Sequence, residues 1–209
     1  MPAAWFGLAR LYLITEEYEK AQTWAQKILK YKPENKLVSS YLDQATAKDN
    51  SAVLEEIRTT KAKRYLTTAW NTARRGDNQG AIRLFQNAIE NDADDIAALN
   101  GLGYTFLSSR QHDKAKPLFQ KCIRLMPKHY AAANGLARCL KAEGKTTEAL
   151  QVWEEIEQAI PGPSAGTVGL AMTYLELKDY ENAIKYLKIL ANSTVTKSND
   201  RFRELLKKA

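Results

Sequence analysis

The sequence predicts an all-α protein in which short helices pair antiparallel and stack as a solenoid. Gly101, Gly135 and Gly169 recur every 34 residues, each inside a run of small and large apolar residues at helical spacing. Glycine and proline are few, 10 and 6 among 209 residues, and no strand-like run competes. With 44% hydrophobic residues the chain can bury a substantial core, and its longest apolar run falls short of the ~18 to 20 residues of a membrane span.

The repeat register extends well beyond the glycines. Pro127 and Pro161 close two of the units and stop their second helices. Each unit offers two amphipathic helices of ~14 residues, which are too short to be stable alone in water and bury their apolar faces by stacking. Aligning three units on their glycines also aligns a leucine, an alanine and a large residue, namely Leu102, Leu136 and Leu170, then Ala115, Ala149 and Ala183, then Phe119, Trp153 and Leu187.

Residues 2–35 show the full pattern most plainly, as Trp5, Leu8, Ala9, Tyr12, Ala21, Ile28 and Pro33. This arrangement resembles the tetratricopeptide repeat. The repeat sequences resemble those of bacterial members of that family more than those of eukaryotic co-chaperones. The resemblance implies a tetratricopeptide-type α-solenoid, in which antiparallel helix pairs form a right-handed superhelix and helix A of each pair lines a concave face. It covers five units, at residues 2–35, 62–95, 96–129, 130–163 and 164–197.

The order of these units is interrupted once, because the register fails between residues 36 and 61. Residues 35–48 and 198–209 each follow a repeat and read as terminal helices that cover its apolar face. We therefore predict that residues 1–49 hold the last repeat and terminal helix of a preceding array, and that residues 50–209 hold four repeats plus a C-terminal capping helix. No helix breaker occurs from Ser51 to Arg75, so one long helix is expected there.

The resemblance implies that a partner binds in the groove lined by the A helices. Aromatic residues and arginine are the usual energetic anchors of interfaces. Side-chain amides one repeat apart can pair with the backbone of an extended peptide, although a solvated role stays open for them. The carboxylate clamp of co-chaperone members is not expected, because Gly101 and Gly135 stand where it needs asparagine. The predicted groove residues are Lys63, Trp70, Arg74, Asn100, Tyr104, Asn134, Arg138, Lys141 and Met172.

The recurring glycines need an explanation, since each costs about 1 kcal/mol against alanine inside a helix. Gly7 occupies the same position in the first unit. The residue four before each of these four glycines shares its helix face and is small, being Ala3, Ala97, Ala131 or Ala165. Two explanations stay open. Either adjacent A helices approach closely along this strip, or the strip is an exposed floor of backbone over which a ligand lies.

The net charge permits an acidic partner but does not identify one. The net charge is +7, and residues 58–75 carry six cations and no acid. This stretch either meets an acidic peptide or forms a solvated face. RNA binding ranks third among the possible functions, because neither an aromatic platform nor a base-reading pattern is evident.

Catalytic and metal-binding patterns are missing from the sequence. His112 and His129 lie in separate turns, and Cys122 and Cys139 read as buried free thiols. We therefore predict a non-enzymatic scaffold without cofactor or small-molecule substrate, which binds a protein or peptide that is acidic or extended. The alternative is a structural or self-associating segment of a larger protein. The compartment stays open, with the cytoplasm slightly favoured and a targeting segment upstream of Met1 left as an alternative.

Overall fold

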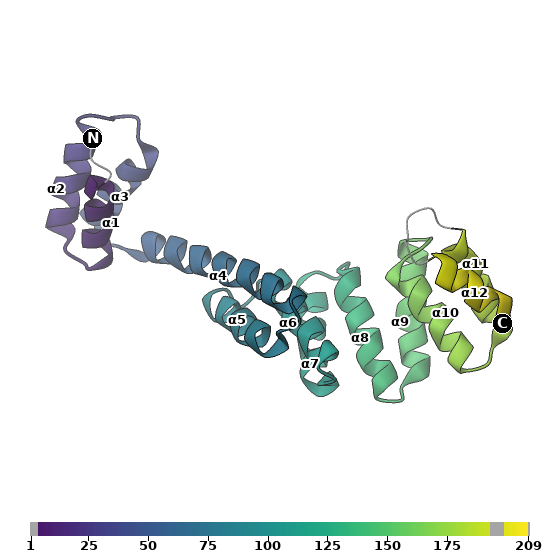
Figure 1. The fold of residues 1–209 in the computed structure, drawn as a ribbon. Coiled ribbons are helices and arrows are strands. Elements are labelled where there is room, and N and C mark those ends of the chain that lie inside the picture. Colours follow the sequence, from purple (N-terminus) through teal and green to yellow (C-terminus); the bar gives the residue numbers. More distant parts are fainter. Residues whose placement is uncertain (1–3, 193–198, 209) are drawn as a thin grey trace. The chain divides into compact units, whose positions relative to one another are not determined.

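The computed structural model describes residues 4–192 and 199–208 (Figure 1). Within these ranges the chain forms helices and no strand, and the predicted all-α solenoid of antiparallel helix pairs is confirmed. The chain divides into two compact units, Met1–Arg64 and Tyr65–Ala209. Among the described residues no helix is long and apolar enough to cross a membrane.

The first unit contains α1 (Ala4–Ile14), α2 (Tyr18–Leu29), α3 (Lys36–Ala47) and the beginning of α4 (Ser51–Arg74). Helices α1, α2 and α3 pack against one another around a core that includes Leu13, Ile28 and Tyr41. Helix α4 is the long helix expected from the absence of breakers after Ser51. The assignment of residues 1–49 to a separate array stays a prediction.

The second unit continues from α4 through a stack of helix pairs. These helices are α5 (Asn78–Asn91), α6 (Ile96–Ser108), α7 (His112–Leu125), α8 (Tyr130–Ala142), α9 (Thr146–Ala159), α10 (Ala165–Glu176), α11 (Tyr180–Ala191) and α12 (Asn199–Lys208). The A helices α6, α8 and α10 contact one another in that order, and each also packs on the B helix that follows it. Helix α12 packs on α11 and buries Phe202. Residues 193–197, which end the fourth predicted repeat, lie outside the described residues.

Local sequence signals explain where these helices begin and end. Asp95 accepts hydrogen bonds from the amides of Ala97 and Ala98 at the start of α6, and Ser164 forms a capping box with Thr167 at the start of α10. Helices α7 and α9 stop two residues before Pro127 and Pro161, as the sequence predicts. Side-chain caps therefore fix where the A helices α6, α8 and α10 begin.

Candidate functional site

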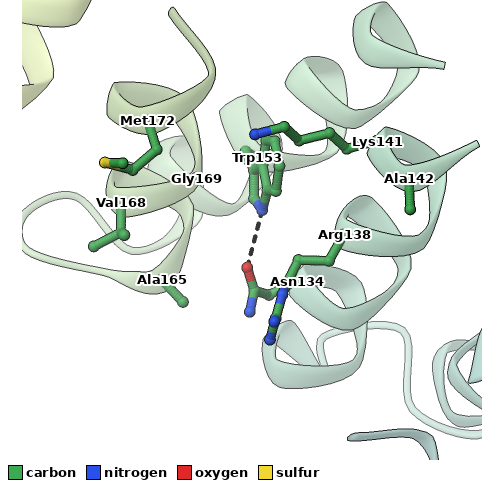
Figure 2. A pocket seen from close by; sticks show the side chains of 9 residues that line it. All are labelled: Asn134, Arg138, Lys141, Ala142, Trp153, Ala165, Val168, Gly169 and Met172. Atoms are coloured by element: carbon green, nitrogen blue, oxygen red, sulfur yellow. Dashed lines mark hydrogen bonds between the residues drawn. The ribbon is translucent and has the colours of Figure 1, made fainter. Parts of the chain in front are cut away.

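A cavity of about 620 Å³ opens between α8 and α10 (Figure 2), and we call it the α8–α10 hollow. Helix α8 supplies polar and charged side chains on one side, and α10 supplies small and apolar side chains on the other. The indole of Trp153, from α9, lies between the two helices at the back of the hollow. The lining residues are Asn134, Arg138, Lys141, Ala142, Trp153, Ala165, Val168, Gly169 and Met172.

The position of Trp153 depends on the glycine that faces it. A Cβ atom placed on Gly169 would lie 2.4 Å from Cε2 of the indole, well inside van der Waals contact. Because glycine has no Cβ, the indole packs directly against the α10 backbone and is only 2% exposed. Together with Val168 and Met172 it gives the hollow an apolar floor and wall.

A chain of hydrogen bonds fixes the polar side of the hollow. The Trp153 Nε1–H donates to Oδ1 of Asn134 at 2.9 Å (Figure 2), and Nδ2–H of Asn134 donates to the Tyr104 hydroxyl at 3.0 Å. That hydroxyl donates in turn to the carbonyl oxygen of Ala131 at 2.7 Å. The chain links α9, α8 and α6, so it holds the orientation of Asn134 and reduces its capacity to bind a ligand backbone.

Tyr104 is mostly enclosed by this arrangement. Its ring lies edge-on to Phe119, with centroids 5.1 Å apart. Burial raises the pKa of the Tyr104 hydroxyl, while the hydrogen bond from Asn134 and the charge of Arg138 act in the opposite direction. The side chain is therefore a neutral structural bridge between α6 and α8 at physiological pH.

The two cations of the α8–α10 hollow differ in their partners. Lys141 forms an ion pair with Glu176 of α10, with Nζ 2.8 Å from Oε2. Arg138 is exposed and has no hydrogen-bond or ion-pair partner among the residues that the structure describes. Since the lining contains no carboxylate, the Arg138 guanidinium is the charge that is available to a ligand.

A second cavity of about 370 Å³ lies between α4 and α6, and we call it the α4–α6 hollow. Trp70 is 38% exposed here and its ring lies edge-on to Phe85, with centroids 5.3 Å apart. Arg74 is exposed at the end of α4 and also has no partner among the described residues. The lining residues are Trp70, Ala73, Arg74, Asn78, Gly101, Tyr104, Thr105 and Ser108.

Most of the predicted groove residues line one of these hollows. Asn134, Arg138, Lys141 and Met172 meet at the α8–α10 hollow, and Trp70, Arg74 and Tyr104 meet at the α4–α6 hollow. Asn100 lines neither, and its Oδ1 is buried without a hydrogen-bond partner among the described residues. Lys63 belongs to the first unit and is not among the residues that line either hollow.

Sequence reasoning missed Trp153 as part of the site, because its alignment with Phe119 and Leu187 marks it as a core residue. It is a core residue by burial, yet one surface of its indole lines the hollow. The aligned position of Phe119, Trp153 and Leu187 did contain a signal that could have identified Trp153. Trp153 is the one member whose ring also carries an N–H, and a buried indole N–H needs an acceptor such as Asn134.

The recurring glycines receive a third explanation, which differs from both expectations. The ring that faces each glycine comes from the B helix of the preceding repeat, and a Cβ would lie 2.4 Å from its nearest atom in all three cases. No neighbouring A-helix backbone fills the space, and Gly101 and Gly169 also line the two hollows. The pairs are Phe85 with Gly101, Phe119 with Gly135, and Trp153 with Gly169.

The remaining reactive side chains have structural surroundings. Cys122 and Cys139 are fully buried, and burial raises the pKa of each thiol to about 11. Nδ1 of His129 accepts the amide N–H of Ala132 at 3.1 Å and so caps α8. In the described part of the chain no group of three or more histidine, cysteine and acidic residues is arranged to hold a metal ion.

Profiles of the tetratricopeptide repeat match residues 2–35, 66–121, 106–165 and 168–188. These ranges include every residue that lines the two hollows. The chain belongs to the tetratricopeptide-repeat family.

Several proteins with tetratricopeptide arrays are similar to this chain. A UDP-N-acetylglucosamine–peptide N-acetylglucosaminyltransferase of Giardia intestinalis is 31% identical over 103 residues, which are 49% of this chain and 7% of that protein. MamA of Desulfovibrio magneticus RS-1, residues 41 to the end, matches with a TM-score of 0.59 and 21% identity over 70% of this chain and 81% of that one. YrrB matches with a TM-score of 0.58 and 19% identity over 93% and 94% of the two chains. The chain therefore spans a small fraction of the transferase, and the two structural matches show the shared fold.

Proposed function

We propose that this tetratricopeptide chain is a non-enzymatic scaffold that binds a peptide or protein segment in the groove lined by α4, α6, α8 and α10. One observation carries the proposal: the α8–α10 hollow combines an apolar floor at Trp153 with an exposed guanidinium, Arg138, that has no partner among the described residues. An apolar side chain that enters this hollow gains burial, and a neighbouring carboxylate gains a charged hydrogen bond.

The family supports a binding role rather than a catalytic one. YrrB, which shares the fold, is described as a tetratricopeptide protein with an unusual peptide-binding site. The linings of the two hollows include Trp70, Tyr104, Arg74 and Arg138, and tryptophan, tyrosine and arginine are the residue types that most often anchor interfaces. We expect neither a cofactor nor a small-molecule substrate to be needed.

The charges of the groove indicate an acidic ligand. Neither hollow is lined by a carboxylate, while Arg74 and Arg138 each line one of them. Exposed charges of this kind are screened by salt, so binding should weaken as ionic strength rises. The apolar floor adds a contribution that salt does not remove, which separates such a ligand from one held by charge alone.

Binding of the purified chain to fluorescent peptides tests the proposal. The probes are a short extended peptide with leucine beside aspartate, and the same peptide with asparagine in place of aspartate. The variant is Arg138→Glu, which changes an exposed side chain and should leave the fold intact. The matched control is Arg124→Glu, which makes the same charge change at an exposed position of α7, a B helix.

We expect the acidic peptide to bind the wild type and the Arg124→Glu protein equally, and Arg138→Glu to lose at least tenfold in affinity. Equal weakening by both variants would show that net charge, rather than this hollow, attracts the peptide. Light scattering of the free chain addresses the self-association alternative. A mass that rises with concentration, together with peptide binding that never exceeds background, would indicate that the groove serves assembly and would overturn the proposal.

A further inference from the structure

The two hollows are equivalent features of the repeat architecture, placed two repeats apart. Each lies between consecutive A helices and includes the glycine of the second one, Gly101 in the α4–α6 hollow and Gly169 in the α8–α10 hollow. Each also contains the residue three after that glycine, Tyr104 or Met172. A ligand that lies along the groove therefore meets the same kind of depression twice.

The junction between the two hollows is bridged by one side chain. Tyr104 reaches from α6 to α8, where its hydroxyl donates to the carbonyl of Ala131 and accepts from Asn134. Its ring packs edge-on to Phe119, which in turn occupies the space in front of Gly135. The Tyr104 side chain thus lies between α6 and α8, where the repeat pattern would otherwise place a third hollow.

The electrostatic features repeat together with the hollows. Arg74 lines the first hollow and Arg138 the second, and both are exposed without a partner among the described residues. Lys141 is already engaged by Glu176 at 2.8 Å. Each hollow therefore presents one available guanidinium beside a partly apolar depression.

From this repetition we propose that the partner is an acidic, extended protein segment with two anchor side chains, one for each hollow, each next to a carboxylate. Neighbouring helices lie about 8 to 10 Å apart, so two repeat steps span roughly 16 to 20 Å. An extended chain rises about 3.3 Å per residue, which separates the two anchors by about five or six residues. The intervening residues pass over Tyr104. This inference rests on the proposed function and specifies its ligand.

The linings favour different anchors at the two ends. Val168 and Met172 give the α8–α10 hollow aliphatic walls that suit leucine. Trp70 and Tyr104 give the smaller α4–α6 hollow two aromatic rings, with Ser108 and Asn78 as polar neighbours, which suits tyrosine. Leucine and tyrosine side chains would be buried in the two hollows. The phosphates of a single-stranded nucleic acid would contact only the two arginines, Arg74 and Arg138.

The test measures affinities of the intact chain for designed peptides. The bipartite probe carries leucine–aspartate and tyrosine–aspartate anchors five residues apart, in both orders, joined by glycine and serine. Comparison probes carry one anchor, or both anchors at separations of two and ten residues. Linking two anchors raises affinity only when the linker is long enough to span the two sites, and the gain falls slowly as the linker becomes longer. The protein variants are Arg74→Glu, Arg138→Glu and the control Arg124→Glu.

We expect the bipartite peptide with a separation of five residues, in its better order, to bind at least tenfold more tightly than either single-anchor peptide and than the peptide with a separation of two residues, which is too short to span the hollows. The separation of ten residues should change the affinity by about threefold or less, because the linker is flexible. Arg74→Glu should reduce the affinity of the bipartite peptide to that of the leucine peptide alone, and should leave the leucine peptide's own affinity unchanged. Affinity that is independent of separation, with Arg138→Glu still harmful, would overturn the two-anchor inference while the proposed function stands. Insensitivity to Arg138→Glu would overturn both. Tighter binding of an oligouridylate that competes with the peptide would also overturn the inference.

Discussion

Asn100 and Asn134 occupy the same position of successive repeats, but among the described residues only the side chain of Asn134 has hydrogen-bond partners. Oδ1 of Asn134 accepts the indole N–H of Trp153 at 2.9 Å, whereas Oδ1 of Asn100 is buried without a partner among the described residues. The residue that corresponds to Trp153 one repeat earlier is Phe119, whose ring has no donor. The same amide is therefore satisfied in one repeat and unsatisfied in the preceding one.

This difference predicts opposite effects of one substitution. Asn134→Leu should lower the free energy of unfolding by about 1 to 3 kcal/mol, because the buried Trp153 N–H loses its acceptor. Asn100→Leu removes an acceptor that has no partner, so stability should stay equal or rise. Urea unfolding followed by circular dichroism measures both effects. Equal losses in the two variants would contradict the hydrogen-bond explanation.

The glycines allow a second paired experiment. Gly135→Ala should destabilise the second unit by about 1 to 3 kcal/mol, since the new Cβ would lie 2.4 Å from Phe119 and overpack a buried ring. That ring cannot withdraw easily, because it also packs against Gly103. The destabilisation should appear despite the better helix propensity of alanine.

Gly7→Ala is the matched control for that experiment. Gly7 lies inside α1, and a Cβ there would meet no atom within 4 Å. The substitution should stabilise the first unit by up to about 1 kcal/mol through helix propensity alone. Hydrogen exchange of the amides in α1 and α8 separates the two units. Destabilisation at Gly7 would show that the helix needs glycine there for another reason.

The two buried thiols predict a dependence of reactivity and stability on pH. The pKa of Cys122 and of Cys139 is raised to about 11, so at pH 8 about one molecule in a thousand carries the reactive thiolate. The native chain should resist iodoacetamide at this pH and react only on unfolding. Because the unfolded thiols ionise first as pH rises above about 8.5, the folded state holds more protons and loses stability there. Rapid labelling of native protein at pH 8 would contradict this.

Periodicity predicted the fold because each repeat places the same residue types at the same contacts. Gly101, Gly135 and Gly169 revealed the 34-residue register, and Pro127 and Pro161 marked the ends of two B helices. Most predicted groove residues line a hollow because an A-helix position determines which face a side chain occupies. The repeat register, the helix ends and the groove positions can each be predicted from the sequence of a single helix.

Contacts between helices were harder to predict. The three aromatic rings that fill the glycine positions come from the preceding B helix, so the reason for each glycine lies in another element of the chain. Likewise the Tyr104–Asn134–Trp153 chain needs three helices to converge. Sequence spacing identified Asn134 as a groove residue, but its internal hydrogen bonds depend on the position of α9.

The ion pair at the rim of the α8–α10 hollow predicts a substitution that strengthens binding. The Glu176 carboxylate lies 2.8 Å from the Lys141 ammonium, and its side chain is 60% exposed. An exposed pair of this kind contributes about 0 to 1 kcal/mol, so Glu176→Gln should leave the fold stable. The change releases Lys141 as a second available cation beside Arg138. Affinity for the leucine–aspartate peptide should then rise severalfold and depend more steeply on salt.

Two controls separate this local effect from a change in net charge. Glu148→Gln removes the same charge from an exposed position near the start of α9, outside the residues that line the hollow, and should change affinity much less. Lys141→Met combined with Glu176→Gln should cancel the gain, because no cation is released. Titrations at two ionic strengths give all the comparisons. The explanation is wrong if Glu148→Gln raises the peptide affinity as much as Glu176→Gln does. It is also wrong if the double variant keeps the raised affinity, because Lys141 would then not be the group that Glu176 keeps from the ligand.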